Sequence, residues 1–200
     1  MEDLFLKCIE QFGNLGIFFL IFIENVFPPI PSEVVLGMGG IFIIETNLTF
    51  ISVLFSSTLG SIMGALVLYY IGRHLNSPNV RKYFIGEDKV LKLGQDKLEK
   101  IKSIYQKYER VSIFFLRMVP IFRSIISIPA GMFKMNILEF VILTGLGSLI
   151  WNSIIIYAGM TLGDNWAYIK KIINDYTLIV IALLLVSTTI YFFKKYRNKK

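Results

Sequence analysis

The stretch ENVFPPIPSE, residues 24–33, decides how this chain can fold. It places Glu24, Glu33 and three prolines in the middle of an apolar segment that runs from residue 15 to residue 44. A proline removes a backbone donor and breaks a helix, and lipid tolerates broken backbone only where protein or a cavity covers it. An ionisable residue at bilayer depth is costly, so it is a functional candidate by default. The stretch therefore predicts an interrupted membrane segment that carries a site.

A second interruption carries the opposite charge. The sequence RMVPIFR, residues 117–123, lies inside another apolar run, from residue 111 to residue 133. One apolar segment is thus broken around acids and the other around arginines. This pattern predicts a transporter-like site for a charged molecule inside the membrane.

The composition indicates an integral membrane protein. The chain has 200 residues, of which 54% are hydrophobic, and its mean hydropathy of +0.62 is too high for an ordinary soluble domain. One membrane domain over residues 1–200 is expected. The net charge of +7 comes from bases between and after the apolar blocks, which indicates contact with lipid headgroups rather than nucleic acid. Cys8 is the only cysteine, which excludes an internal disulfide or a cysteine metal cluster, and no metal or other cofactor is expected.

Apolar and polar blocks divide the chain into segments. The two apolar arms around the prolines have about 12 residues each, fewer than the roughly 20 that a spanning helix needs. The predicted segments are an interfacial helix over 1–12, a re-entrant hairpin over 13–45, a transmembrane helix over 49–71, a basic cytoplasmic loop over 72–110, a second re-entrant hairpin over 111–135, transmembrane helices over 138–160 and 177–194, and a basic tail over 195–200. The predicted fold class is therefore an all-α integral membrane protein.

A broken apolar segment followed by a full span occurs twice. A shift of 87 residues places Leu59-Gly60-Ser61 on Leu146-Gly147-Ser148, and a shift of 91 places Gly40 on Gly131. Weak internal symmetry of this kind points to repeat-built transporters, whose site lies at the repeat interface. Chance similarity between two hydrophobic segments is the alternative, although glycines match by chance less easily than apolar residues.

The distribution of basic residues predicts that the repeats are inverted. Residues 72–110 hold ten and residues 194–200 hold five of the 21 basic residues, so both regions should face the cytoplasm. If residues 111–133 crossed the membrane once, these two regions would lie on opposite sides. If residues 111–133 enter and return, both regions are cytoplasmic. The second hairpin is therefore expected to dip in from inside and the first from outside, with their tips meeting near the midplane.

The charged residues at the two interruptions are the candidate site. Glu24 and Glu33 are predicted to bind a proton or a sodium ion whose release is coupled to transport. Arg117 and Arg123 are predicted to bind a phosphate, because guanidinium groups stay charged and fork onto phosphate oxygens. Ser124 and Ser127 can add hydroxyl donors, with a hydrogen bond to their own backbone as the alternative. Two alternatives stay open. The acids and arginines pair only to hold the hairpins together, or Arg117 extends to the membrane interface.

Uncharged residues complete the candidate site. Ser32 is the expected N-cap of the second arm of the first hairpin. The predicted tip residues are Pro29, Pro31, Pro120 and Gly131, and the predicted cavity-lining residues are Trp151 and Asn152. Packing is the alternative role for Trp151.

These residues also carry a resemblance to a known family. The motifs are ENVFPPIPSE at 24–33, GSIMG at 60–64 with YIGR at 70–73, FLRMVPIFR at 115–123 with PAG at 129–131, and GSLIWN at 147–152. In this order, over roughly residues 12–165, the sequence resembles the DedA family, which shares the SNARE-associated Golgi protein or VTT domain with eukaryotic lipid scramblases. The resemblance implies two facing re-entrant hairpins, an acid pair and an arginine pair needed for function, and transport of phosphate-bearing lipids. Family members often carry an acid where this chain has Ser61, which argues against a scheme with a third carboxylate.

The resemblance also sets the expected function. In bacteria the family is linked to the return of undecaprenyl phosphate, the cell-wall carrier lipid, to the inner leaflet. Some members are linked to movement of phosphatidylethanolamine. We therefore predict a flippase of the bacterial inner membrane, not an enzyme, with a cytoplasmic C-terminus, membrane lipids as partners and coupling to a proton or sodium gradient.

Other functions stay open as alternatives. They are a phosphatidylethanolamine flippase or scramblase, a membrane enzyme such as a lipid phosphatase, and an assembly factor that does not transport. A phosphatase would normally need a nucleophile or a base, and the sole histidine, His74, lies at a predicted membrane exit. A monomer and a homodimer are both compatible with the sequence.

Overall fold

The computed structural model describes residues 2–27, 32–75, 95–120 and 122–163, and within these ranges every regular element is a helix. The helices are α1 (Glu2–Phe12), α2 (Asn14–Val26), α3 (Ser32–Glu45), α4 (Phe50–Leu75), α6 (Gln95–Leu116), α7 (Phe122–Ile125), α8 (Ser127–Met132) and α9 (Ile137–Leu162). They belong to one compact unit, Met1–Gly163. Residues 76–94 of the predicted basic loop, the predicted span over 177–194 and the basic tail lie outside the described residues.

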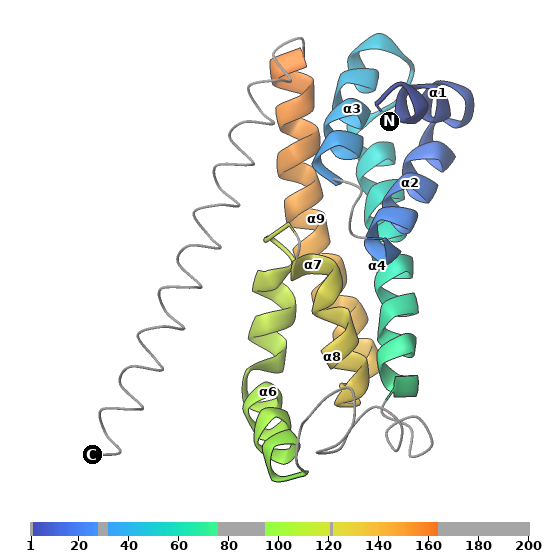
Figure 1. The fold of residues 1–200 in the computed structure, drawn as a ribbon. Helices are drawn as coiled ribbons and strands as arrows, with labels where there is room; N and C mark the ends of the chain where they lie inside the picture. The colour runs from blue at the N-terminus through green and yellow to red at the C-terminus, as the bar shows by residue number, and fades with distance from the viewer. Residues whose placement is uncertain (1, 28–31, 76–94, 121, 164–200) are drawn as a thin grey trace. The chain divides into compact units, whose positions relative to one another are not determined.

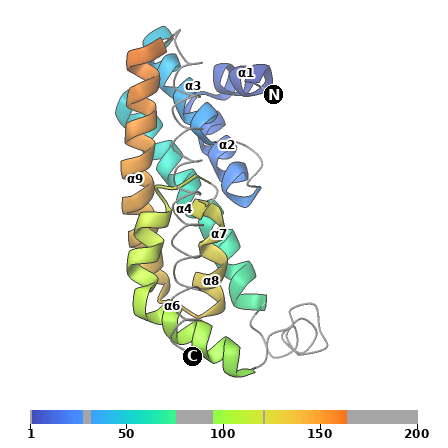
Figure 2. The same ribbon diagram turned by 60° about the vertical axis from the view of Figure 1, so that its left-hand side comes forward.

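Of the described helices, α4 and α9 are long and apolar enough to cross a membrane. Each has 26 residues, or about 39 Å at 1.5 Å per residue, which exceeds the roughly 30 Å of a bilayer core. They lie side by side in both views of the ribbon (Figures 1 and 2). These ranges agree with the two spans expected from the sequence over 49–71 and 138–160.

Both long helices begin at a capped position. The Thr49 hydroxyl accepts a hydrogen bond from the Ser52 backbone N–H at 3.2 Å, and the Asn136 side chain accepts one from the Leu138 N–H at 2.9 Å. A side-chain oxygen at this position satisfies a backbone donor that has no partner within the helix. Thr49 and Asn136 are related by the same shift of 87 residues as the glycine-serine motifs.

The first hairpin consists of α2 and α3, on either side of the proline stretch. They have 13 and 14 residues, about 20 Å each, so neither is long enough to cross a bilayer. α1 precedes them and buries Phe5 and Ile9, which lie on one face of the helix. Gly13, with φ 53°, occupies the left-handed region and turns the chain from α1 into α2. That α1 lies at the membrane interface, and that α2 and α3 re-enter it, stay predictions.

The second half departs from the boundaries expected from the sequence. The polar end of the predicted loop and the first apolar arm form one continuous helix, α6, rather than separate elements. Residues 95–119 contain no glycine or proline, so nothing interrupts the helix where polarity changes near Arg110. The second arm is instead divided into α7 and α8. Pro129 explains this break, because it cannot donate the helical hydrogen bond to Ile125, where α7 ends.

The hairpins and long helices exchange partners. α2 packs on α4 and α6 packs on α9, so each first arm contacts the long helix that follows it in sequence. In contrast, α3 packs on α9 and α8 packs on α4, so each second arm contacts the long helix of the other half. We call these two pairings the exchanged contacts. In Figure 1, α2 and α3 lie beside the upper half of α4 and α9, and α6 to α8 lie beside the lower half. The end of α2 and the start of α7 therefore meet near the middle of the long helices.

Glycines allow the exchanged contacts. A Cβ on Gly40 of α3 would meet the Ile156 carbonyl oxygen of α9, and a Cβ on Gly131 of α8 would meet the Tyr69 carbonyl oxygen of α4. These two contacts correspond under the shifts of 91 and 87 residues. The contacts of Gly159 with Gly37 and of Gly72 with Ile128 correspond in the same way. Small residues permit such close helix packing in a membrane. That the hairpins enter from opposite sides stays a prediction.

Candidate functional site

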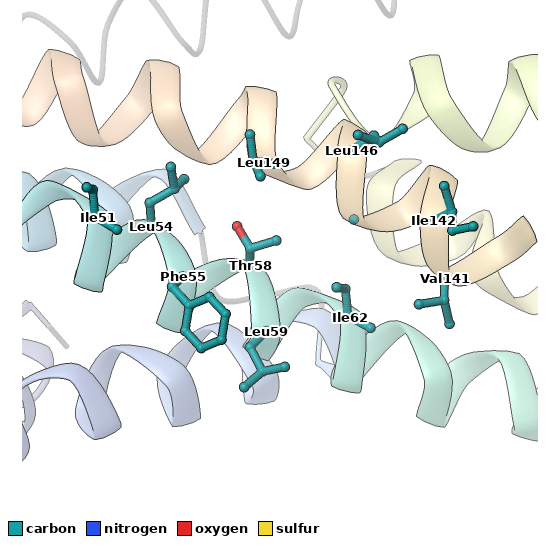
Figure 3. Close-up of a pocket in the computed structure, with 11 residues that line it drawn as sticks. Ile51, Leu54, Phe55, Thr58, Leu59, Ile62, Val141, Ile142, Leu146 and Leu149 are labelled. Atoms are coloured by element: carbon teal, nitrogen blue, oxygen red, sulfur yellow. The ribbon is translucent and has the colours of Figure 1, made fainter. Parts of the chain in front are cut away.

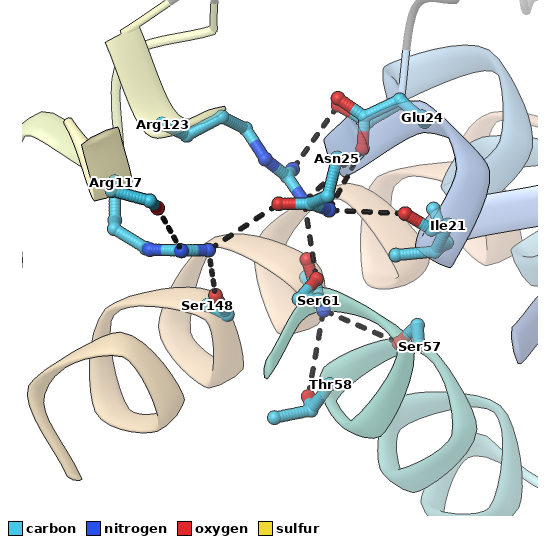
Figure 4. Close-up of polar contacts among 12 residues, drawn as sticks. Ile21, Glu24, Asn25, Ser57, Thr58, Ser61, Arg117, Arg123 and Ser148 are labelled. Atoms are coloured by element: carbon cyan, nitrogen blue, oxygen red, sulfur yellow. Dashed lines mark hydrogen bonds and ion pairs between the residues drawn. The ribbon is translucent and has the colours of Figure 1, made fainter. Parts of the chain in front are cut away.

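Two arginines and two glutamates are buried where the hairpins meet beside the long helices. Figure 4 shows three of them, Arg117, Arg123 and Glu24, with their polar contacts. Arg117 is 1%, Arg123 2%, Glu24 4% and Glu33 8% exposed. Arg117 follows the last turn of α6, Arg123 lies in α7, Glu24 lies at the end of α2 and Glu33 at the start of α3. Buried charges are costly unless they are paired or bind a ligand. The four charged residues thus lie at the ends of helices that meet here, and that they form a functional site stays a prediction.

Arg123 has a carboxylate as a partner. Its Nη2 lies 3.4 Å from Glu24 Oε2, and also donates to the Ser61 hydroxyl of α4 at 3.1 Å. Its Nη1 donates to the Ser32 hydroxyl of α3 at 3.1 Å. Ser32, expected as an N-cap, is thus an acceptor for Arg123 in the first turn of α3. The charge of Arg123 is balanced by Glu24.

Arg117 has only uncharged hydrogen-bond partners among the described residues. Its Nη1 donates to Asn25 Oδ1 at 3.4 Å and to the Ser148 hydroxyl of α9 at 3.2 Å. Its Nη2 donates to the Ser127 hydroxyl of α8 at 3.2 Å. Asn25 in turn donates to Glu24 Oε2 at 3.0 Å, so its amide lies between the Arg117 guanidinium and that carboxylate. Within the described ranges, Arg117 is therefore a buried cation with no carboxylate hydrogen-bonded or ion-paired to it.

Three buried polar atoms of this cluster have no hydrogen-bond partner within the described part of the chain. They are the Nε atoms of Arg117 and Arg123 and Oε1 of Glu33. A buried polar group without a partner costs about 1–3 kcal/mol, and more when it is charged. Such groups are rare in native structures, and where they occur they often mark a functional site. The unpaired N–H groups are donors suited to an anion, and the Glu33 oxygen can accept a proton or a cation.

Asn152 extends the polar cluster along the seam between α4 and α9. It is fully buried, and its amide lies within hydrogen-bond distance of the Ser57 hydroxyl at 3.3 Å and the Thr58 hydroxyl at 3.4 Å. Its Oδ1 has no hydrogen-bond partner among the described residues. Trp151 is also buried. Asn152 thus lies among polar groups. That Trp151 and Asn152 line a cavity stays a prediction.

The remaining predicted site residues are placed in different ways. Ser124 is buried in α7 directly after Arg123. Pro120 lies at the turn between α6 and α7, whereas Gly131 lies in α8, against α4, rather than at that turn. The expected tip position of Gly131 is therefore not what the structure shows, because Gly131 is needed where α8 and α4 approach closely. Pro29 and Pro31 lie outside the described residues.

Of the neutral partners of the arginines, only Ser127 was expected to add a hydroxyl to the site. The amide of Asn25 stands beside Glu24 in an otherwise apolar helix, which is a signal that could have been used. Ser61 and Ser148 match under the shift of 87 residues, and each accepts a hydrogen bond from one arginine. Ser61, the departure from the family pattern, thus gives Arg123 a neutral acceptor. In the described part of the chain, no group of three or more histidine, cysteine, aspartate or glutamate side chains is arranged to hold a metal ion.

Comparison with known proteins identifies relatives along most of the chain. A family model described as the VTT domain matches residues 30–161. A protein of Lactococcus lactis subsp. cremoris named alkaline phosphatase-like protein is 42% identical over 185 residues, 92% of this chain and 86% of that protein. Undecaprenyl phosphate transporter A of Staphylococcus aureus is 31% identical over 200 residues, 100% of this chain and 98% of its own length. The protein of the same name from Bacillus subtilis is 32% identical over 193 residues, covering 96% and 93%. No solved structure matches the chain.

Proposed function

This chain is a member of the VTT domain family, the DedA family of membrane proteins, and we propose that it transports a phosphate-bearing lipid across the membrane. Undecaprenyl phosphate is the proposed substrate, because two relatives that match nearly the whole chain are named for its transport. The observation that carries the proposal is the buried Arg117, whose hydrogen-bond partners among the described residues are all uncharged. A guanidinium in that setting is suited to an anionic headgroup.

The phosphate is bound first by Arg117. A phosphate supplies the negative charge that Asn25, Ser127 and Ser148 do not, and its oxygens can accept from both sides of the guanidinium, including Nε. The serine hydroxyls can rotate from acceptor to donor, so they can turn toward the phosphate when it enters. The site is closed in this structure, since Arg117 is buried, and headgroup entry therefore requires the hairpins or the long helices to move.

Arg123 is the second phosphate ligand, and Glu24 controls its availability. Glu24 and the phosphate compete for the same guanidinium, since Arg123 Nη2 lies 3.4 Å from the carboxylate. When Glu24 takes up a proton or a cation, this ion pair weakens, and Arg123, with Ser124 beside it, turns toward the phosphate. Glu33 is a second buried carboxylate of the same cluster, at the start of α3, and can take up the proton or cation together with Glu24. Lipid binding and proton or sodium binding thereby strengthen each other.

The two hairpins provide the alternating access that transport requires. We place the chain in the bacterial inner membrane with its C-terminus in the cytoplasm, the first hairpin entering from outside and the second from inside. Transport then consists of rocking one half against the other about the exchanged contacts of α3 with α9 and α8 with α4. The corresponding glycine contacts in the two halves support this arrangement.

A membrane phosphatase is the second candidate, favoured by the name of the relative from Lactococcus. Hydrolysis of a phosphate ester needs a nucleophile activated by a base. The hydroxyls of Ser32, Ser61, Ser127 and Ser148 contact the guanidiniums, but no histidine, lysine or free carboxylate is hydrogen-bonded to any of them in the described residues. His74 lies in the last turn of α4. Transport is therefore the better account of this site.

Reconstitution tests the proposal. Full-length protein in liposomes should move labelled undecaprenyl phosphate between leaflets without releasing inorganic phosphate, and Arg117→Gln should reduce the rate at least about 100-fold, since it removes a charge-assisted ligand of the headgroup. Lys7→Gln, a charge change outside the site, serves as the matched control. Release of inorganic phosphate would instead identify the enzyme. A folded protein that does neither would identify a non-transporting role.

A further inference from the structure

A groove of about 500 Å³ follows the seam between α4 and α9 (Figure 3). Phe55, Leu59 and Ile62 line it from α4, and Leu146 and Leu149 from α9. Thr58 carries the only polar side chain among the described lining residues. The volume lies within the range of small-molecule sites, about 300–1,000 Å³. The groove therefore offers a hydrocarbon environment with one polar group, the Thr58 hydroxyl.

The Thr58 hydroxyl connects the groove with the buried polar cluster. Thr58 Oγ1 accepts from the Asn152 amide at 3.4 Å. Ser61 lies one helical turn after Thr58 in α4, and Ser148 lies one helical turn before Asn152 in α9. These serines accept hydrogen bonds from Arg123 and Arg117. Hydrocarbon-lined space and guanidinium groups thus meet on the same helix seam. An amphiphile with an anionic head and an apolar chain matches both surfaces at once.

The length of the groove and its neighbour, the buried cluster, favour a lipid chain as the occupant. The lining residues of α4 run from Ile51 to Ile62, a rise of about 17 Å. An extended hydrocarbon chain can lie along this length while its anionic headgroup reaches the guanidinium groups. An apolar helix of this chain or of a second copy has no anionic group to place there.

We propose that this groove binds the hydrocarbon chain of the lipid monophosphate whose headgroup is bound by Arg117. The inference rests on the proposed function, and it adds a second subsite that makes the protein selective for the chain as well as for the phosphate. Thr58, which lies within the groove and accepts from Asn152, is the point where the groove adjoins the buried polar cluster. Lipids with a phosphate but no suitable chain then bind only through the arginines.

Photo-crosslinking tests which molecule occupies the groove. Leu146 and Ile150 are both exposed on α9, but only Leu146 lines the groove. With p-benzoylphenylalanine replacing Leu146 in the full chain, undecaprenyl phosphate in liposomes should be captured at least about fivefold more than with the same replacement at Ile150, because only the first position faces the bound chain. Adding Arg117→Gln should abolish the excess capture.

Three outcomes of this experiment would overturn the inference. Equal capture at the two positions would show that the groove has no preference for the substrate chain. Excess capture that survives Arg117→Gln would show that ordinary bilayer lipid fills the groove. Capture of residues 164–200 or of a second copy at Leu146 would show that protein covers it.

A binding experiment separates failure of this inference from failure of the proposed function. Leu146→Trp should weaken binding of undecaprenyl phosphate by about tenfold or more, about 1.4 kcal/mol, while binding of methyl phosphate, which lacks the chain, stays unchanged. Ile150→Trp is the matched control and should alter neither. If Leu146→Trp and Ile150→Trp bind the lipid equally well, the groove is not a subsite although the phosphate site stands. If the wild-type protein binds neither ligand, the proposed function fails and the inference fails with it.

Discussion

The two halves of the molecule, residues 14–75 and 95–162, share a scaffold but not a chemistry. Corresponding glycines make the exchanged helix contacts, corresponding residues cap the long helices, and Ser61 and Ser148 each accept a hydrogen bond from an arginine. The first half supplies Glu24 and Glu33, and the second supplies both arginines. The comparison teaches that the repeated positions build the scaffold, whereas the site is made where the halves differ.

The same comparison separates the two arginines. Each contacts one serine of a long helix and one serine of the second arm of a hairpin: Ser61 and Ser32 for Arg123, and Ser148 and Ser127 for Arg117. They differ in one partner, which is the Glu24 carboxylate for Arg123 and the neutral Asn25 amide for Arg117. Nearly equal surroundings thus hold one balanced and one unbalanced cation. Stability should depend more on the first, and anion binding more on the second.

The largest expected effect on stability comes from the balanced arginine. Arg123→Gln leaves Glu24 buried without its cation, and breaking a buried pair in this way typically costs about 3–5 kcal/mol. Arg117→Gln should cost clearly less, because its partners are neutral. Thermal unfolding of the two variants in detergent measures the difference. The double variant Glu24→Gln with Arg123→Gln should recover part of the loss, and equal losses for both single variants would contradict the distinction.

The exchanged glycine contacts should respond alike in the two halves. Gly40→Ala and Gly131→Ala each place a Cβ against a backbone carbonyl of the opposing helix, and overpacking of this kind costs about 1–3 kcal/mol. Gly145→Ala is the matched control, since its Cβ would meet only the end of the Ile62 side chain at 3.4 Å. Unfolding midpoints of the three variants give the comparison. A large loss at only one of the two exchanged positions would argue against a shared scaffold.

The helix caps provide a smaller test of the same symmetry. Thr49→Ala and Asn136→Ala remove the side-chain acceptors at the starts of α4 and α9, each worth about 1 kcal/mol. Replacement of Asn136 by aspartate or serine keeps an acceptor and should restore most of the stability. Denaturation in mixed detergent can resolve such differences. An Asn136→Ala variant as stable as the wild type would show that this cap contributes nothing.

The smallest expected effect comes from Glu109, which lies beside a surface ion pair of the second half. In that pair, Arg110 Nη2 lies 2.7 Å from Glu139 Oε1. The pKa of Glu109 is raised, first by partial burial of its carboxyl group and then by repulsion from Glu139. A raised folded-state pKa means that the folded protein holds the proton more tightly than the unfolded chain. The stability contribution is therefore complete at low pH and is lost as pH rises through the Glu109 titration. Glu109→Gln should flatten this dependence, and an unchanged pH profile would contradict it.

The sequence predicted the helices where breaking signals are strong. The prolines after Val26 and the long apolar runs placed α2, α3, α4 and α9 within a few residues. The continuity of α6 was missed because a change in polarity was taken for a boundary, although no residue in it breaks a helix. The division between α7 and α8 was missed although Pro129 signals it.

The charged residues of the site were predicted from the free-energy cost of placing an ionisable side chain in a membrane segment, since such residues are usually functional. Of the neutral partners only Ser127 was expected to contribute. A serine or asparagine in a membrane helix can bond to its own backbone and carries no comparable signal. Which arginine pairs with Glu24 could not be read from the sequence. That choice depends on the side-chain geometry at the meeting of α2 and α7.

The most direct measurement of the central claim is the affinity of undecaprenyl phosphate for Glu24→Gln and Arg117→Gln, compared with the wild type. If Glu24 withholds Arg123 from the phosphate, Glu24→Gln should bind the lipid about tenfold more tightly, since a second charged donor becomes available, and Arg117→Gln should lose binding. If Glu24→Gln binds no more tightly than the wild type, or if Arg117→Gln binds normally, the two arginines do not have the roles assigned to them here.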